Sequence, residues 1–127
     1  MICIGVGKSG YIAQKMSATL ASIGVVSFYL HPTEAIHGDL GRIRSGDICI
    51  FFSHSGNSTE LIPVLNYCNQ YKIDTVSITG NTRGTLAQET MHSLSYNIES
   101  ELCPNNLAPT SSPTLSLIIA DLFCVGL

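Results

Sequence analysis

A short segment of the chain, Ser53–Glu60, gathers residues well suited to chemistry and reads Ser-His-Ser-Gly-Asn-Ser-Thr-Glu. It follows Ile48–Phe52, an apolar run typical of a buried strand, and it precedes a helical pattern. Hydroxyl groups and the free N–H groups at the start of a helix bind anions, because they donate hydrogen bonds where the helix dipole favours negative charge. Glu60, one turn into the expected helix, would add a carboxylate. The segment therefore indicates chemistry on a phosphorylated small molecule; the simpler alternative is that Ser53 or Ser55 only caps the helix.

A second candidate loop, Gly5–Gly10, formally matches the GxGxxG pattern between an expected strand and an expected helix. A dinucleotide site of this kind requires an acidic residue at the end of the next strand, where the chain has Tyr29–Pro32 instead. A Walker loop is excluded because Ile2 stands where its first glycine belongs. Lys8 suits a small phosphate or a sugar oxygen, and the alternative is a glycine turn with a purely structural role.

Two histidines and two acids occur within residues 31–39 and suggest a metal site. No further ligands with metal-binding spacing lie nearby, and His54 would have to be recruited from another loop, so we expect no metal. His37 is better interpreted as a polar or proton-transfer group at the mouth of a pocket. A solvated or helix-capping histidine is the alternative.

Two acidic residues, Glu99 and Glu101, precede Cys103-Pro104 in the loop after the last expected strand. Glu101 would give the site a second carboxylate, although periodicity alone does not separate it from Glu99. The segment Ala108–Thr114 then opens the last expected helix with four hydroxyl side chains. These hydroxyls form either a second polar rim for a sugar or a helix cap.

The elements that must position these loops alternate between apolar β-rich runs and helical patterns. Strands are expected at Ile2–Gly5, Val25–Leu30, Asp47–Phe52, Thr75–Thr79 and Ser93–Ile98. Helices are expected at Ser9–Ile23, Thr33–Leu40, Ser58–Tyr71, Thr85–Glu89 and Ser112–Val125, with Gly24 ending the first and Pro63 near the first turn of the third. The nearly continuous apolar strands predict an α/β fold, a three-layer doubly wound five-stranded parallel sheet. Ligands of such sheets bind at the carboxyl ends of the strands, where the candidate loops lie.

Charged residues are scarce, with six basic and nine acidic side chains among 127 residues and a net charge of −3. The length indicates one domain over residues 1–127. Low charge and positive mean hydropathy indicate an oligomer or a piece of a longer protein. No basic cluster points to nucleic acid, and no long apolar stretch or signal-like start points to a membrane, so we expect a cytoplasmic protein. The five cysteines form no CxxC pair and are expected to be reduced.

The candidate loops share their residues and their order with one known family. The matching segments are Gly5–Gly10, His31–Ala35, His37–Gly41, Ser53–Glu60, Thr79–Asn81, Glu101–Pro104 and Leu107–Ser112. Through these segments the whole chain resembles the sugar isomerase (SIS) domain, most closely the arabinose 5-phosphate isomerase family. The Ser-x-Ser-Gly loop marks the broad domain class. The His-Gly-Asp and Ala-Pro-Thr-Ser-Ser pieces are specific to the isomerase branch.

The resemblance implies an aldose–ketose isomerase that interconverts D-arabinose 5-phosphate and D-ribulose 5-phosphate through an enediol and supplies the precursor of Kdo. It implies active-site positions at Lys8, Glu60, Glu101 and His37. It places the substrate and its phosphate at Gly7, Ser9, Ser53, His54, Ser55, Ser58, Thr110 and Ser111. Lys8 would stabilise the oxyanion, and Glu101 or Glu60 would be the base, its pKa raised in a partly dry site. Neither a metal nor a nucleotide cofactor is implied, and a homotetramer is expected.

The chain also departs from the family pattern. His54 replaces the usual asparagine, Asn57 the usual glutamate, and Pro113 a threonine. Three parts of the family pattern lie outside the sequence. They are the N-terminal helix, the CBS modules and a His-Pro-Gly-Gly segment that carries a catalytic histidine. We therefore expect a core fragment that binds substrate and isomerises it poorly. The alternatives are a non-catalytic sensor of a sugar phosphate or nucleotide sugar, and a dinucleotide oxidoreductase.

Overall fold

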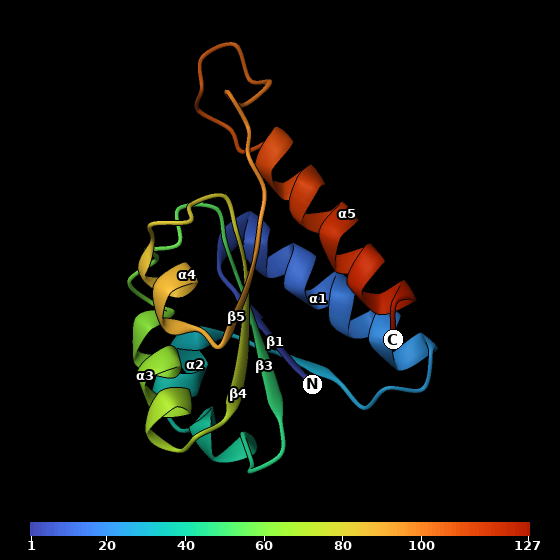
Figure 1. Ribbon diagram of the computed structural model, residues 1–127, viewed down its shortest axis with the longest axis vertical. Coiled ribbons are helices and arrows are strands. Elements are labelled where there is room, and N and C mark those ends of the chain that lie inside the picture. The colour runs from blue at the N-terminus through green and yellow to red at the C-terminus, as the bar shows by residue number, and fades with distance from the viewer.

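Five parallel strands form one sheet in the computed structural model, which describes residues 1–127. The strands are β1 (Ile2–Gly5), β2 (Phe28–Leu30), β3 (Ile48–Ser53), β4 (Asp74–Thr79) and β5 (His92–Ser95). Their order is β2-β1-β3-β4-β5, a doubly wound order that reverses between β1 and β3. The predicted α/β fold with its five-stranded parallel sheet is thereby confirmed (Figure 1).

Helices cover both faces of the sheet and complete three layers (Figure 1). They are α1 (Gly7–Ser22), α2 (Pro32–Ile36), α3 (Ile62–Gln70), α4 (Thr85–Glu89) and α5 (Ser111–Val125), with a 3-10 turn at Asp39–Arg42. Helices α1 and α5 pack together on one face, and α2, α3 and α4 lie on the other. None of them combines the length and the apolar character that crossing a membrane requires.

The central strands feed two separate cores because successive side chains of a strand point to opposite faces of the sheet. Ile2 and Ile4 of β1 join the core beneath α3, whereas Cys3 joins the core beneath α1 and α5. Phe51 and Phe52 of β3 divide between the two cores in the same way. All five side chains are fully buried, which explains why the strands are nearly continuous in apolar residues.

Strand pairing explains where the predicted strand boundaries are wrong. β2 begins later than predicted because its partner β1 starts at Ile2, which lies opposite Phe28. β5 ends earlier than predicted, at Ser95, because Thr79 opposite it is the last residue of β4. The helix predicted over residues 33–40 is divided by Gly38, whose φ of +136° is incompatible with a continuous helix.

The third helix also begins later than predicted, at Ile62 rather than Ser58. The preceding residues form a turn in which the Leu61 N–H donates to the Ser58 carbonyl (3.0 Å). Pro63 lies in the first turn of α3, as predicted, where no intrahelical donor is needed. Glu60 therefore precedes the helix, and the prediction that it lies one turn into it is wrong.

Two glycines bring the start of α1 against β1. A Cβ at Gly5 would lie 2.9 Å from the Ser9 carbonyl oxygen, and a Cβ at Gly10 would lie 2.9 Å from the Gly5 carbonyl oxygen. The Tyr29 hydroxyl lies 3.0 Å from the position of a Cβ at Gly10 and donates to the Gly5 carbonyl (2.8 Å). These glycines have the packing role that the structural interpretation of the loop predicts. Gly24 ends α1 with a φ of +85°, also as predicted.

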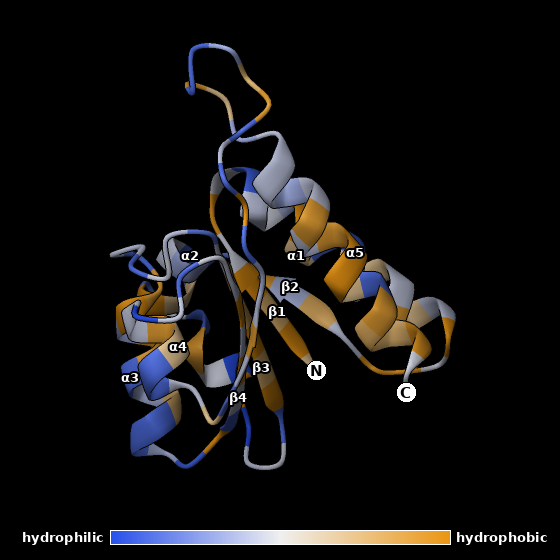
Figure 2. Cartoon of the chain, turned by 45° about the horizontal axis from the view of Figure 1, so that its top comes forward, coloured by the Kyte–Doolittle hydropathy of each residue, from blue (hydrophilic) through white to orange (hydrophobic).

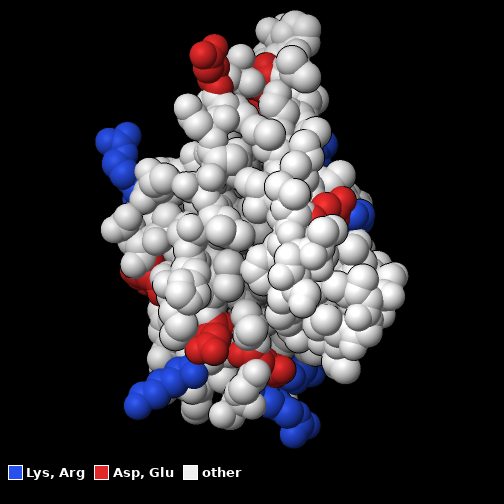
Figure 3. Space-filling model, turned by 45° about the vertical axis from the view of Figure 1, so that its right-hand side comes forward, with Lys and Arg blue, Asp and Glu red and all other residues white.

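The outward side of α5 is apolar. Ile118, Leu122 and Val125 are 50%, 66% and 86% exposed. Hydrophobic residues run along this helix (Figure 2), and the charged side chains leave a broad uncharged area in the middle of the face seen in Figure 3. Contiguous apolar surface of this kind is typical of protein interfaces.

Gly10→Ala is expected to lower the free energy of unfolding by roughly 1–3 kcal/mol, because the added methyl group would overlap backbone atoms of β1. Chemical denaturation of the purified chain measures this loss. Gly41→Ala is the matched control, since a Cβ there meets nothing within 4 Å, and its stability should change by less than about 0.5 kcal/mol. Equal stability of the two variants would contradict the close approach of α1 and β1.

Candidate functional site

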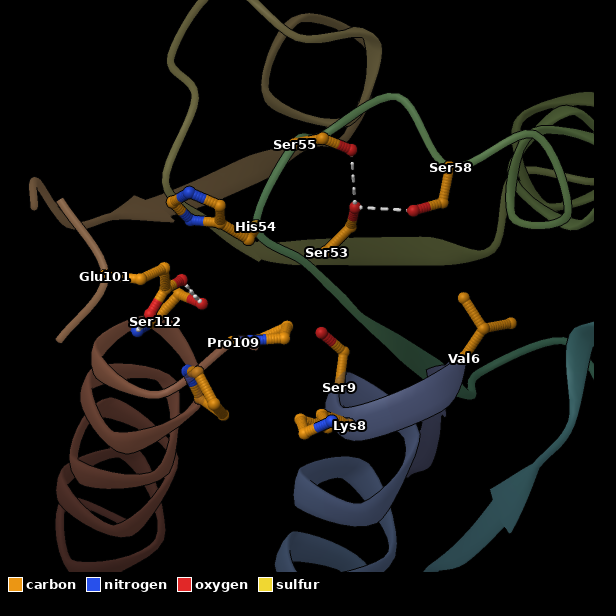
Figure 4. Close-up of a pocket in the computed structure, with 11 residues that line it drawn as sticks. Val6, Lys8, Ser9, Ser53, His54, Ser55, Ser58, Glu101, Pro109 and Ser112 are labelled. Carbon is orange, nitrogen blue, oxygen red and sulfur yellow. Dashed lines mark hydrogen bonds between the residues drawn. The ribbon is translucent and has the colours of Figure 1, made fainter. Parts of the chain in front are cut away.

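A cavity of about 280 Å³ opens at the carboxyl ends of β1 and β3, between the start of α1 and the start of α5 (Figure 4). It is lined by Val6, Lys8, Ser9, Ser53, His54, Ser55, Ser58, Glu101, Pro109, Ser112 and Pro113. Strand order reverses between β1 and β3, which is where ligands of doubly wound sheets bind. The fold thus brings together most of the predicted site residues from three distant parts of the chain.

Three serine hydroxyls converge at the end of β3, and we call them the serine cluster. Ser53 Oγ lies 2.8 Å from Ser58 Oγ and 3.4 Å from Ser55 Oγ (Figure 4). The Gly56 N–H donates to Ser53 Oγ (3.1 Å) and the Asn57 N–H to Ser55 Oγ (3.2 Å). The capping alternative is wrong, because α3 begins after Leu61 without any side-chain cap. The hydroxyls are instead gathered around one point beside the cavity.

The loop carrying the serine cluster is braced by contacts that the sequence did not reveal. Asn57 Oδ1 accepts hydrogen bonds from the N–H (2.9 Å) and hydroxyl (3.0 Å) of Thr85 at the start of α4. Asn81 Nδ2 donates to the Ser55 carbonyl (2.9 Å). Asn57, one of the departures from the family pattern, therefore fixes the loop in place. Only the three-dimensional neighbourhood of residues 57 and 85 identifies this role.

The first turn of α1 adds a cation and a hydroxyl to the cavity. Gly7, with a φ of +56°, turns the chain from β1 into the helix, so that Lys8 and Ser9 follow at its start. Both side chains line the cavity. Lys8 takes part in neither of the chain's two salt bridges, so its ammonium group is available to an anion. The helix dipole adds to the positive potential there.

Glu101 lines the opposite side of the cavity and caps α5. Its carboxylate accepts hydrogen bonds from the N–H groups of Thr110 (2.7 Å), Ser111 (2.6 Å) and Ser112 (3.2 Å). The hydroxyls of Thr110 and Ser112 also donate to it. Helix α5 has no side-chain cap at its own N-cap residue, so Glu101 supplies the acceptor. Thr110 and Ser111, predicted to contact substrate, donate to this carboxylate and do not line the cavity.

These bonds determine the acidity of Glu101. The Ser112 hydroxyl first, and then the N–H groups of the α5 turn, hold the pKa of the Glu101 carboxyl well below its usual range, at about 2. The prediction of a raised pKa is therefore wrong for Glu101. Desolvation acts in the expected direction but is outweighed by donors that stabilise the ionised form.

Other predicted site residues lie outside this cavity. Glu60 is exposed on the turn before α3, where its carboxylate accepts a bond from the Thr59 hydroxyl (3.3 Å). His37 is exposed at the end of α2. Gly7 lines a separate, smaller pocket beside Tyr11. Neither the carboxylate of Glu60 nor the imidazole of His37 therefore lines the cavity.

The acids and histidines of residues 31–39 have local partners. His31 Nδ1 accepts a hydrogen bond from the Thr33 N–H (3.2 Å) and caps α2. Asp39 pairs with Arg42 at 3.1 Å. No three side chains among the His, Cys, Asp and Glu residues lie close enough together to hold a metal ion.

Comparison with known proteins identifies the family of the chain. The SIS domain family matches residues 1–126. The arabinose 5-phosphate isomerase KdsD of Pseudomonas aeruginosa is 40% identical over the whole of this chain and 39% of that protein. The arabinose 5-phosphate isomerase KpsF of Escherichia coli is 42% identical over the whole of this chain and 40% of that protein. The chain thus spans about two fifths of the length of these curated relatives.

A solved structure gives the same result. The structure of the E. coli CFT073 protein c3406 in complex with arabinose 5-phosphate superposes with a TM-score of 0.94 at 38% identity. The superposition covers 98% of this chain and 66% of that one. The fold is therefore shared with a protein that was solved in complex with a sugar phosphate.

The acidity of Glu101 makes a direct prediction. The backbone amide signals of Ser111 and Ser112 should shift with a midpoint near pH 2 in an NMR titration, because protonation of Glu101 removes the negative charge from their acceptor. The depressed pKa also means that the stabilisation from this contact is complete above the ordinary value of 4.5 and is lost as the pH falls toward about 2. Glu101→Gln should abolish the titration of both amides. A midpoint near 4.5 would show that the carboxylate is not held as described.

Proposed function

Since the chain belongs to the SIS domain family, we propose that it binds D-arabinose 5-phosphate and interconverts it with D-ribulose 5-phosphate. The observation that carries this proposal is the serine cluster, which faces a cavity that also holds Lys8 and Glu101. Relatives that bear the name of this isomerase match the chain from end to end, which supports the choice of substrate.

The phosphate group of the substrate occupies the serine cluster. Ser53, Ser55 and Ser58 donate hydroxyl hydrogen bonds to its oxygens, with Ser9 assisting from α1. The N–H groups of Ser58 and Thr59 donate to no acceptor within the protein and supply further donors. A preformed set of donors suits a dianion, since charge-assisted hydrogen bonds are stronger than neutral ones. This anchoring fixes the open-chain sugar with its reacting carbons toward Lys8 and Glu101.

Isomerisation then moves one proton between neighbouring carbons. Glu101 removes the proton from C2 of the aldose, and the C1 carbonyl oxygen gains negative charge as the enediol forms. Lys8 stabilises that oxyanion, as the only cation lining the cavity. The proton moves from O2 to O1, and return of the carbon-bound proton to C1 completes the ketose. Glu101 is assigned as the base over Glu60 because only Glu101 lines the cavity, and geometry takes precedence over acidity in such an assignment.

Membership of the family also suggests an oligomeric state and a pathway. We infer a homotetramer, for which the exposed apolar side of α5 supplies the surface. The reaction supplies the precursor of Kdo in the cytoplasm and requires neither metal nor nucleotide. The segment 1–127 acts as the sugar-phosphate domain.

One observation favours a second function. The low pKa of Glu101 makes its carboxylate a weak base, and its hydrogen bonds are already satisfied by α5. A site of this kind suits a module that binds a sugar phosphate and transmits its presence without turning it over. Such a sensor would need the serine cluster for binding and would not need a strong base.

Proton and phosphorus NMR of the chain with arabinose 5-phosphate in heavy water distinguishes the two functions. The isomerase is expected to form ribulose 5-phosphate carrying deuterium at the exchanging carbon. Broadened and shifted sugar-phosphate signals without conversion would establish the sensor instead. An absence of any change would contradict both.

Two matched carboxamide variants test the base. Glu101→Gln should lower kcat by about 10²–10⁴-fold, the range of general base catalysis, with little change in KM. Glu60→Gln should remain close to the unmodified chain, because its side chain lies outside the cavity. Loss of turnover in Glu60→Gln together with retained turnover in Glu101→Gln would reverse the assignment.

A further inference from the structure

Three hydrogen-bonded polar side chains connect the cavity to α5. His54, which lines the cavity, lies with its Nδ1 3.2 Å from the Tyr96 hydroxyl oxygen. Ser116 of α5 donates its hydroxyl proton to the same Tyr96 oxygen (3.0 Å). The two rings also stack, with centroids 5.7 Å apart and planes inclined by 22°. None of these contacts is needed for the phosphate and proton-transfer roles assigned above.

The hydrogen bonds among Ser116, Tyr96 and His54 run in one direction. Because Ser116 donates to the Tyr96 oxygen, the phenolic proton remains free to be donated onward to His54 Nδ1. An imidazole that accepts at Nδ1 carries its proton on Nε2 when it is neutral. Ser116 is 4% exposed, so its hydroxyl has little competing water. The second ring nitrogen of His54 is then left as an N–H donor.

The two rings lie directly over Gly80. A Cβ at Gly80 would lie 2.3 Å from His54 Nδ1 and 3.2 Å from Tyr96 Cε2. Any larger residue at position 80 would therefore push the imidazole out of its place. Tyr96 is held in turn by its own N–H, which donates to the Thr79 carbonyl at the end of β4 (3.1 Å). The imidazole is thus fixed by the stacked phenol, by the hydrogen bond and by the missing side chain of Gly80.

We infer that Tyr96 and Ser116 are positioning residues that hold His54 in the tautomer protonated on Nε2, so that this N–H is a hydrogen-bond donor for an anionic ligand in the cavity that His54 lines. The inference rests on the proposed function for the identity of the ligand, but the tautomer is a property of the protein alone. A neutral donor at this place adds directionality to a site whose only cation is Lys8. The hydrogen bonds through Tyr96 and Ser116 also connect His54 to α5.

The test uses the full chain labelled with ¹⁵N-histidine and long-range proton–nitrogen NMR. Without ligand, His54 should show a pyridine-like Nδ1 and a protonated Nε2. Added inorganic phosphate, and then arabinose 5-phosphate, should shift the Nε2 signal of His54. In Tyr96→Phe the tautomers should mix, and the dissociation constant for inorganic phosphate should rise about fivefold, the usual effect of one lost hydrogen bond.

Tyr71→Phe is the matched control, because Tyr71 is exposed at the end of α3 and should leave tautomer and affinity unchanged. Gly80→Ala is the second variant and keeps every hydroxyl of the chain of donors. It should displace the His54 ring and reproduce the loss seen in Tyr96→Phe, which keeps the inference testable if that variant folds poorly. A proton found on Nδ1 in the unmodified chain would overturn the inference. Retention of both tautomer and affinity in Tyr96→Phe would overturn it as well.

The two proposals fail in different ways. In the first case, arabinose 5-phosphate is not converted, but inorganic phosphate shifts the Nε2 signal in the unmodified chain and shifts it less in Tyr96→Phe. The isomerase proposal then falls and the role of His54 stands. If arabinose 5-phosphate is converted while the Nε2 signal ignores both phosphate compounds, the isomerase stands and the role of His54 is wrong.

Discussion

The hydroxyl of Ser53 links the core of the sheet to the cavity. Ser53 is the last residue of β3, a central strand paired with β1 and β4, and it is 4% exposed. Its oxygen contacts the hydroxyls of Ser55 and Ser58 and accepts the N–H of Gly56. Because the strand fixes Ser53, the loop that follows is organised before any ligand arrives. Preorganised donors spare a ligand the cost of ordering the loop, which favours binding.

The start of α5 imposes an opposing constraint on the same cavity. Glu101 takes the place of a helix cap there, and the donors that stabilise its negative charge also reduce its basicity. Any movement that loosens the contact with Ser112 would raise the basicity of Glu101 while weakening the start of the helix. Capping the helix and the proposed proton transfer therefore make different demands on this one carboxylate. The hydrogen bonds in the structure satisfy the capping demand.

Local patterns in the sequence were sufficient for the fold and for the gathering of the serine cluster. Buried parallel strands have a continuous apolar pattern, and their loops must meet at one edge of the sheet. The boundaries near Ser58 and Val25 were wrong because they depend on turn geometry and on strand register. The exposed position of Glu60 follows from the same late start of α3.

Properties that depend on distant neighbours escaped prediction. The pKa of Glu101 is lowered by the Ser112 hydroxyl first and then by N–H groups of the α5 turn, about ten residues away along the chain. Tyr96 carries no motif, and its contact with His54 joins residues 42 positions apart. The bracing role of Asn57 likewise requires Thr85, which only the fold brings near. Residue type and spacing indicated most of the polar side chains that line the cavity, whereas their acidity and partners required the structure.

Calorimetric titration of the chain with arabinose 5-phosphate and with unphosphorylated D-arabinose tests the central claim that the serine cluster is a phosphate site. The account predicts saturable binding of the phosphate ester, no measurable binding of the free sugar, and a several-fold loss of affinity for the ester in Ser58→Ala. Equal affinity for the two sugars, or unchanged affinity for the ester in Ser58→Ala, would contradict it.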